Sequence, residues 1–184
     1  YKPPEKAPDQ PAFVILEFEK GIPVKLNGKR KPLGEIIPEL NAIGGSHAIG
    51  KIDIFEDGMM DLKSREIYEA PAAMIILKLH RDLEQFCLTK DEIQFKKGVD
   101  QKWAYLIYHG MAYHPLRYDL DAFIERSQKL VNGEYKVKLY KGNIDIVHRD
   151  SKTSLFSPEI RSIKATGFDQ RRCADAVSYT HLRA

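Results

Sequence analysis

The sequence has few cysteines, no long apolar run and no initiating methionine. Its two cysteines, Cys87 and Cys173, are far apart and make no metal-ligand spacing, and no signal peptide precedes them; they are therefore interpreted as reduced thiols of a cytosolic protein. The longest uncharged apolar run covers residues 70–77, far short of the ~20 residues that a membrane-spanning helix requires. These absences predict a cytoplasmic protein that does not cross a membrane.

The sequence also lacks an excess of either charge. Its 29 Lys and Arg residues stand against 26 Asp and Glu residues, for a net charge of +3, and the two signs are interleaved along the chain. A nucleic-acid-binding domain usually carries a basic stripe and a pI above about 9, whereas the pI here is about 8.7. We therefore expect no nucleic-acid partner. The length of 184 residues suits one globular domain, which needs neither metal nor disulfide to hold its core.

The pattern of apolar residues predicts an α+β domain in which long helices pack on an antiparallel sheet. Hairpins are predicted for 12–19 with 22–26 and for 135–140 with 144–147, and 52–56 is expected to pair with 59–63. Helices are predicted from Leu33 to the Gly44-Gly45 pair, from Pro71 to Cys87, from Thr89 to Tyr108 and over 119–131.

The domain is expected to span residues 11–170. Residues 1–10 are rich in proline and are interpreted as a lead-in, which together with the missing methionine suggests part of something longer. Residues 171–184 have no clear period and form an irregular tail. Within it, residues 177–184 resemble translated sequencing-adaptor read-through, so we expect them to be non-native and exclude them from the fold.

Three motifs are weak candidates for a site. The stretch from Gly45 to Lys51 has the glycine and lysine spacing of a phosphate loop, but it lacks the Ser or Thr and stands between a helix and a strand in the wrong order. The six histidines form no metal-ligand pattern, so no metal site is expected. The aromatic series from Trp103 to Tyr118 could stack bases, but a core and interface face explains it more simply.

Residues 51–71 are the strongest candidate. Charged and hydroxyl side chains gather there between two apolar elements, just before a helix begins: Asp53, Glu56, Asp57, Lys63, Ser64, Arg65 and Tyr68. Carboxylates on the strand could bind an ammonium group, while the helix N-terminus could take an anion, which together would suit a zwitterion such as an amino acid. A structural network of ion pairs explains the same composition equally well.

The order of motifs along the chain resembles the C-terminal synthetase domain of the argininosuccinate synthase family over about nine-tenths of the sequence. The motifs that carry the resemblance are Glu17-Phe18-Glu19-Lys20-Gly21-Ile22-Pro23-Val24, Gly50-Lys51-Ile52-Asp53-Ile54, Lys63-Ser64-Arg65-Glu66-Ile67-Tyr68-Glu69-Ala70-Pro71 and Leu139-Tyr140-Lys141-Gly142-Asn143. The sequence departs from the family pattern at Gly58, where arginine is usual, at Asp61, where glycine is usual, and near Ala112, where tryptophan is usual.

The resemblance implies an ATP-dependent ligase of arginine biosynthesis, which joins citrulline and aspartate and releases AMP and pyrophosphate. It implies that Glu56 and Tyr68 contact citrulline, and Lys63, Ser64 and Arg65 are possible supporting residues. The site for ATP with Mg²⁺, the Ser-Gly-Gly-x-Asp loop, is absent from these residues, so we expect a fragment that is inactive alone and whose parent is a homotetramer. The alternative is a non-catalytic oligomerisation or amino-acid-binding module on the same scaffold.

Overall fold

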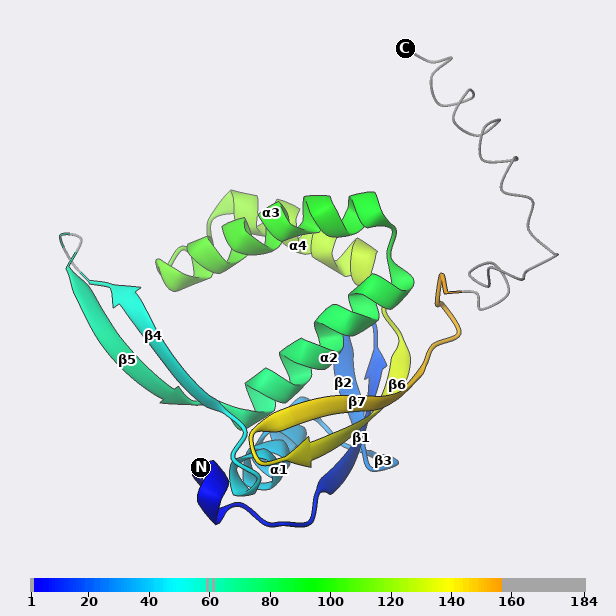
Figure 1. The fold of residues 1–184 in the computed structure, drawn as a ribbon. Coiled ribbons are helices and arrows are strands. Elements are labelled where there is room, and N and C mark those ends of the chain that lie inside the picture. The colour runs from blue at the N-terminus through cyan, green and yellow to red at the C-terminus, as the bar shows by residue number, and fades with distance from the viewer. Residues whose placement is uncertain (1, 59, 61, 157–184) are drawn as a thin grey trace, which may run out of the picture. The chain divides into compact units, whose positions relative to one another are not determined.

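The computed structural model describes residues 2–58, 60 and 62–156 and divides the chain into two units, 1–154 and 155–184 (Figure 1). In the first unit the described residues form an α+β fold, as the sequence predicts. Its five-stranded antiparallel sheet has the order β3-β2-β1-β6-β7, and β4 and β5 form a separate two-stranded sheet. The predicted domain boundary at residue 170 and the tail 171–184 lie outside the described residues.

The elements follow one another with short connections. The strands are β1 (Ala12–Glu19), β2 (Ile22–Leu26), β3 (Lys29–Arg30), β4 (Lys51–Asp57), β5 (Lys63–Glu69), β6 (Gly133–Tyr140) and β7 (Asn143–Asp150). The helices are α1 (Leu33–Ser46), α2 (Pro71–Cys87), α3 (Lys90–Tyr108) and α4 (Pro115–Gln128), preceded by a short 3₁₀ turn at Pro4–Lys6.

The five-stranded sheet forms where apolar and polar residues alternate. On β1 the side chains of Val14, Leu16 and Phe18 are all buried, because every second residue of a strand points to the same face. In the register of β1 with β6, Val14 lies opposite Val137 and Leu16 opposite Tyr135. Strand β1 also pairs with β2, and β6 pairs with β7, both antiparallel, so both predicted hairpins are confirmed. Residues of α1 and α2 complete the same core.

Several predicted boundaries are wrong. The partner of β4 is Lys63–Glu69 rather than 59–63, because Asp57 at the end of β4 lies opposite Lys63, beside a hydrogen bond from the Gly58 N–H to the Leu62 carbonyl (2.6 Å). Helix α4 begins at Pro115 rather than at 119, since the ring of His114 accepts a hydrogen bond from the Leu116 N–H and caps the helix. Helix α1 continues through Gly44 and Gly45 to Ser46.

An ionic cluster ties α2 to the sheet. The Asp82 carboxylate accepts hydrogen bonds from the hydroxyl of Tyr135 on β6 (2.8 Å) and from the guanidinium of Arg149 on β7 (2.6 and 2.9 Å). Tyr135 is completely buried, so its hydroxyl needs this partner. Burial would raise the pKa of Asp82, but the hydrogen bonds from Arg149 and Tyr135 outweigh it and lower that pKa below its usual value.

Asp82→Asn is expected to flatten the loss of stability in acid. A carboxylate whose pKa is lower in the folded state stabilises the protein above its unfolded pKa, and this contribution disappears as the pH falls through the folded value. The variant should lose on the order of 1 kcal/mol at pH 7, and it should differ less from the parent below about pH 3. Urea unfolding between pH 2 and 7 measures this; a difference at about pH 2 equal to that at pH 7 would contradict it.

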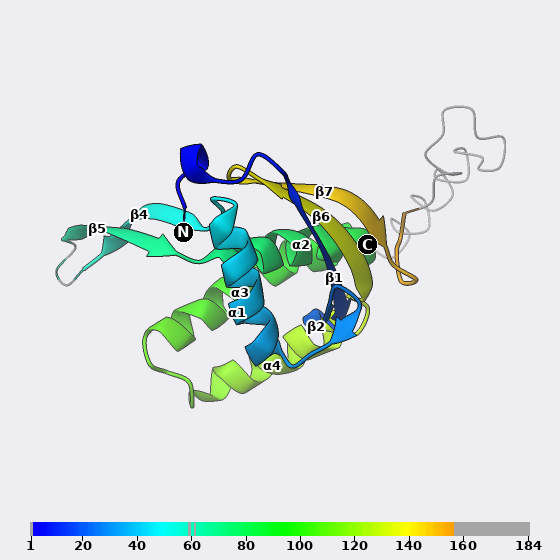
Figure 2. The same ribbon diagram turned by 90° about the horizontal axis from the view of Figure 1, so that it is seen from below.

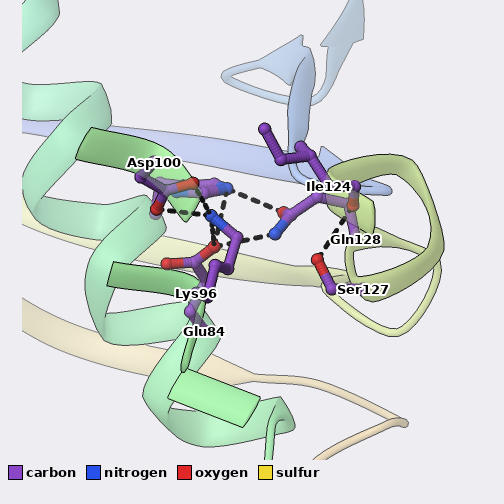
Figure 3. Close-up of polar contacts among 7 residues, drawn as sticks. Glu84, Lys96, Asp100, Ile124, Ser127 and Gln128 are labelled. Atoms are coloured by element: carbon purple, nitrogen blue, oxygen red, sulfur yellow. Dashed lines mark hydrogen bonds and ion pairs between the residues drawn. The ribbon is translucent and has the colours of Figure 1, made fainter. Parts of the chain in front are cut away.

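A second polar cluster attaches α3 and α4 to α2 (Figure 3). Lys96 of α3 is 5% exposed, and its ammonium lies 3.0 Å from the Glu84 carboxylate of α2 and 2.7 Å from Asp100. Gln128 of α4 donates to Glu84 (2.7 Å) and accepts from His80 of α2 (2.9 Å). Buried charges are tolerated when they are paired in this way, so the cluster fixes three helices to one another.

Candidate functional site

The β4–β5 hairpin starts from the first turn of α2. The Ala70 N–H bonds the Gly50 carbonyl (2.8 Å), which closes the base of the hairpin at the point where α2 begins. Gly50 has a φ of +113°, and a Cβ there would lie 2.5 Å from the nitrogen of Pro71. Only glycine allows this approach, so the hairpin has a fixed root beside α2, and both figures of the fold show it extending away from the five-stranded sheet (Figures 1 and 2).

The register of the hairpin divides its side chains between two faces. Pairs run from Lys51 opposite Glu69 to Asp57 opposite Lys63, and alternation places every second pair on the same face. The Tyr68 face carries Ile52, Ile54, Glu56, Ser64, Glu66 and Tyr68. The Arg65 face carries Lys51, Asp53, Phe55, Asp57, Lys63, Arg65, Ile67 and Glu69.

Glu56 and Tyr68 meet on the Tyr68 face. The Tyr68 hydroxyl donates a hydrogen bond to Glu56 Oε1 at 2.9 Å, although the two residues belong to different strands and are twelve positions apart. This hydrogen bond, followed by burial and the charges of Glu56 and Glu66, raises the pKa of Tyr68. The phenol therefore keeps its proton at neutral pH and acts as a donor.

The Arg65 face is neutralised by its own ion pairs. The Arg65 guanidinium donates two hydrogen bonds to the Asp53 carboxylate (2.8 and 2.6 Å), and Lys63 pairs with Asp57. The hydrogen bond with Asp53 raises the pKa of Arg65, and the same bond lowers the pKa of Asp53. Of the three possible supporting residues, the hairpin thus brings only Ser64 to the side of Glu56 and Tyr68, and it directs Lys63 and Arg65 to the other side.

The Tyr68 face keeps its negative charge. Among the described residues, neither Glu56 nor Glu66 has an ion-pair partner. Sequence reasoning missed Glu66, because the predicted partner segment 59–63 left residue 66 outside the hairpin. The alternation of residues 63–69 is the signal that could have found it.

The N-terminus of α2 is largely used by the fold itself. Pro71 has no N–H, and the Ala72 N–H donates to the Asn41 side chain of α1 at 2.9 Å. Pro71 and Ala72 are both buried. The predicted anion site at this helix end therefore has few donors left, and the chemistry of the region is that of the two carboxylates and the phenol.

The other sequence candidates have structural explanations. Gly45 lies in α1, and the helix–loop–strand order of residues 45–51 excludes a phosphate loop. No group of three or more His, Cys, Asp or Glu side chains suited to a metal occurs in the part of the chain that the structure describes. Trp103 donates to Asp121 of α4 (2.7 Å) and is half-buried, whereas the tyrosines after it are exposed and belong to no core: Tyr105, Tyr108, Tyr113 and Tyr118.

Of the three departures from the family pattern, the two that the structure describes lie outside the Glu56–Tyr68 contact. Gly58 is in the hairpin turn and Ala112 follows the end of α3. Asp61 lies outside the described residues. In the described parts of the helices, no segment is long and apolar enough to cross a membrane.

Comparison with known proteins assigns the chain to a class. A family profile described as "Arginosuccinate synthase C-terminal domain" matches residues 1–184. Because this match covers the whole chain, the chain belongs to the argininosuccinate synthase family.

Individual relatives agree with this assignment. The argininosuccinate synthase of Pyrococcus furiosus is 49% identical over 168 residues, which are 91% of this chain and 41% of the relative. That of Rubrobacter xylanophilus is 43% identical over 182 residues, 98% of this chain and 44% of the relative. That of Archaeoglobus fulgidus is 48% identical over 168 residues, which are 91% of this chain and 43% of the relative. The chain thus spans less than half the length of the curated relatives it matches.

Proposed function

We propose that this chain provides one side of the citrulline-binding site of an argininosuccinate synthase, an ATP-dependent carbon–nitrogen ligase of arginine biosynthesis. In that reaction the ureido oxygen of citrulline attacks the α-phosphate of ATP and pyrophosphate leaves. The amine of aspartate then displaces AMP to give argininosuccinate. Membership of the family supports the reaction, and the geometry of the hairpin supports the role of this domain within it.

The observation that carries the proposal is the Tyr68 face. Among the described residues, the Glu56 carboxylate has no ion-pair partner, and it accepts a hydrogen bond from the Tyr68 hydroxyl at 2.9 Å that holds it in place. An unpaired carboxylate beside a fixed hydroxyl is suited to the α-ammonium group and neighbouring polar atoms of an amino acid. Ser64, directly opposite Glu56 in the register, adds a second hydroxyl to the same surface.

These residues position a substrate and do not transfer protons. Phosphoryl transfer is catalysed mainly by alignment and by stabilisation of charge, and nothing on the Tyr68 face could neutralise a phosphate. We therefore assign the binding of ATP with Mg²⁺, of aspartate and of the remaining atoms of citrulline to the part of the relatives that lies beyond this chain. The proposal includes a cytoplasmic homotetramer without nucleic acid or membrane as partner.

Release of pyrophosphate from ATP, citrulline and aspartate tests this proposal. This chain would be assayed alone and as a chimera, in which it replaces the matching 168 residues of the Pyrococcus furiosus enzyme. We expect turnover by the chimera and none by the chain alone, because the phosphate site is supplied by the rest of the enzyme. The same exchange into the Rubrobacter xylanophilus enzyme guards against a mismatch between the two halves.

Two results would overturn the proposal in different ways. Turnover by the chain alone would place a phosphate site within these residues. Two folded chimeras without turnover would favour the non-catalytic module, for which the exposed tyrosines Tyr105, Tyr108 and Tyr113 provide a possible interface. Self-association of the chain through these tyrosines, measured by analytical ultracentrifugation, is the result that the alternative predicts.

A further inference from the structure

We propose that Glu66 is a second ligand-binding carboxylate of this site, and that it shares one ammonium group of the ligand with Glu56. The inference rests on the proposed function and deepens it, because it specifies which chemical group of the amino acid the Tyr68 face selects. The residues of the hairpin, their register and their pairing carry the argument.

The register places Glu66 beside the contact between Tyr68 and Glu56. Tyr68 lies opposite Ile52 and Glu56 lies opposite Ser64, so their side chains bridge four positions, about 13 Å, along one face. The pair Ile54 and Glu66 occupies the position midway between them on the same face. The side chains of Tyr68 and Glu56, joined by their hydrogen bond of 2.9 Å, therefore reach across the position from which the Glu66 side chain extends.

The hydrogen-bonding capacity of the cluster is unbalanced. A phenol has one hydrogen to donate, and an ionised carboxylate only accepts. The hydrogen of Tyr68 goes to Glu56, so Glu66 receives none from it. In the described part of the chain no lysine, arginine or histidine pairs with either glutamate. The one donor of the face is thus used by Glu56, whereas an ammonium group with three donors would satisfy both carboxylates.

The Arg65 face of the hairpin has cations, whereas the Tyr68 face has none among the described residues. Lys63 and Arg65 are on the same strand as Glu66, but they point away from it and pair with Asp57 and Asp53. The described residues of the hairpin thus supply cations to one face only. Glu66 is also half-buried, as is Glu56, whereas the acidic residues of the Arg65 face are exposed. A partly covered carboxylate without a cation gains more from a bound ammonium than a fully solvated one does.

Steady-state kinetics tests whether Glu66 binds the α-ammonium group of citrulline. In the chimera, Glu66→Gln is expected to raise the KM for citrulline about five- to tenfold and to leave kcat and the KM for ATP nearly unchanged. With citrulline that lacks its α-amino group, the variant and the parent should have the same KM. Glu69→Gln, the same change on the same strand but on the Arg65 face, is the matched control and should have no such effect.

A titration of the chain by itself tests the placement of Glu66 without any activity. Tyrosine labelled with ¹³C at Cζ reports the pKa of Tyr68 by NMR, with Tyr68→Phe to assign its signal. Glu66 is one of the charges that raise this pKa, together with Glu56 on β4 and Tyr108 on α3. Glu66→Gln should therefore lower the pKa of Tyr68, and Glu69→Gln should change it less.

The two measurements separate the failures. An unchanged pKa of Tyr68 in Glu66→Gln would remove Glu66 from the cluster and overturn the inference, whether or not the chimera is active. A lowered pKa together with an unchanged KM for citrulline in an active chimera would overturn it as well, because the carboxylate would be near the phenol but unused. Inactive chimeras with a lowered pKa would overturn the proposed function, and with it this assignment of the ligand.

Discussion

Replacing Lys96 with methionine is expected to reduce the free energy of unfolding by about 3–5 kcal/mol. The ammonium of Lys96 is almost completely buried between Glu84 (3.0 Å) and Asp100 (2.7 Å). Methionine has a similar length but no charge, so packing is largely kept while the Glu84 carboxylate, only 13% exposed, loses its cation. Urea unfolding followed by circular dichroism measures the change.

Two further variants make this prediction sharp. Lys97→Met changes the next residue of α3, which is exposed, and should alter stability by no more than about 0.5 kcal/mol. The double variant Lys96→Met with Glu84→Gln removes both charges and should recover part of the loss, since no buried charge is left alone. A single Lys96→Met variant as stable as Lys97→Met would show that the buried pair contributes nothing.

The second large effect is expected in the binding of citrulline. Glu56→Gln in the chimera should raise the KM for citrulline about 30- to 100-fold, because the amide keeps the shape of the side chain but loses the charge that pairs with an ammonium. The KM for aspartate should change no more than about twofold, since its site is assigned to another part of the enzyme. Steady-state kinetics with each substrate varied in turn gives both values.

Asp57→Asn is the matched control for Glu56→Gln. It removes a carboxylate at the neighbouring position of β4, but on the Arg65 face, where Asp57 pairs with Lys63. Its KM for citrulline should stay close to that of the parent chimera. An equal rise in the KM for citrulline and for aspartate in Glu56→Gln would separate Glu56 from the citrulline site and leave it a structural role in the hairpin.

Local signals predicted much of the fold. The turns at Lys20-Gly21 and Lys141-Gly142 both have positive φ values at each residue, which is the geometry that a two-residue hairpin loop requires. The capping box of Thr89 and Glu92 is present, with the Glu92 N–H donating to the Thr89 hydroxyl at 3.3 Å. These features depend on a few neighbouring residues, so a sequence is sufficient to recognise them.

The predictions of element boundaries were wrong where contacts with other parts of the fold determine the boundary. His114 is not a common N-cap residue, so the start of α4 at Pro115 could not be read from the usual signals. The register of β4 with β5 depends on the length of the turn between them, which the sequence does not display. Because the wrong partner strand was expected, the meeting of Glu56 with Tyr68 followed only from the family resemblance, and the position of Glu66 did not follow at all.

The two faces of the hairpin have a consequence for how such a site can change. Deleting Ile67 while Tyr68 keeps its place would move Arg65 to the position of Glu66 and Lys63 to the position opposite Glu56. The same polar side chains would then neutralise one another within the site, and an ammonium ligand would meet no free carboxylate. The register of β5 against β4 therefore decides which charged side chains of β5 share a face with Glu56. The loss of one apolar residue would abolish the preference of this surface for a cationic group.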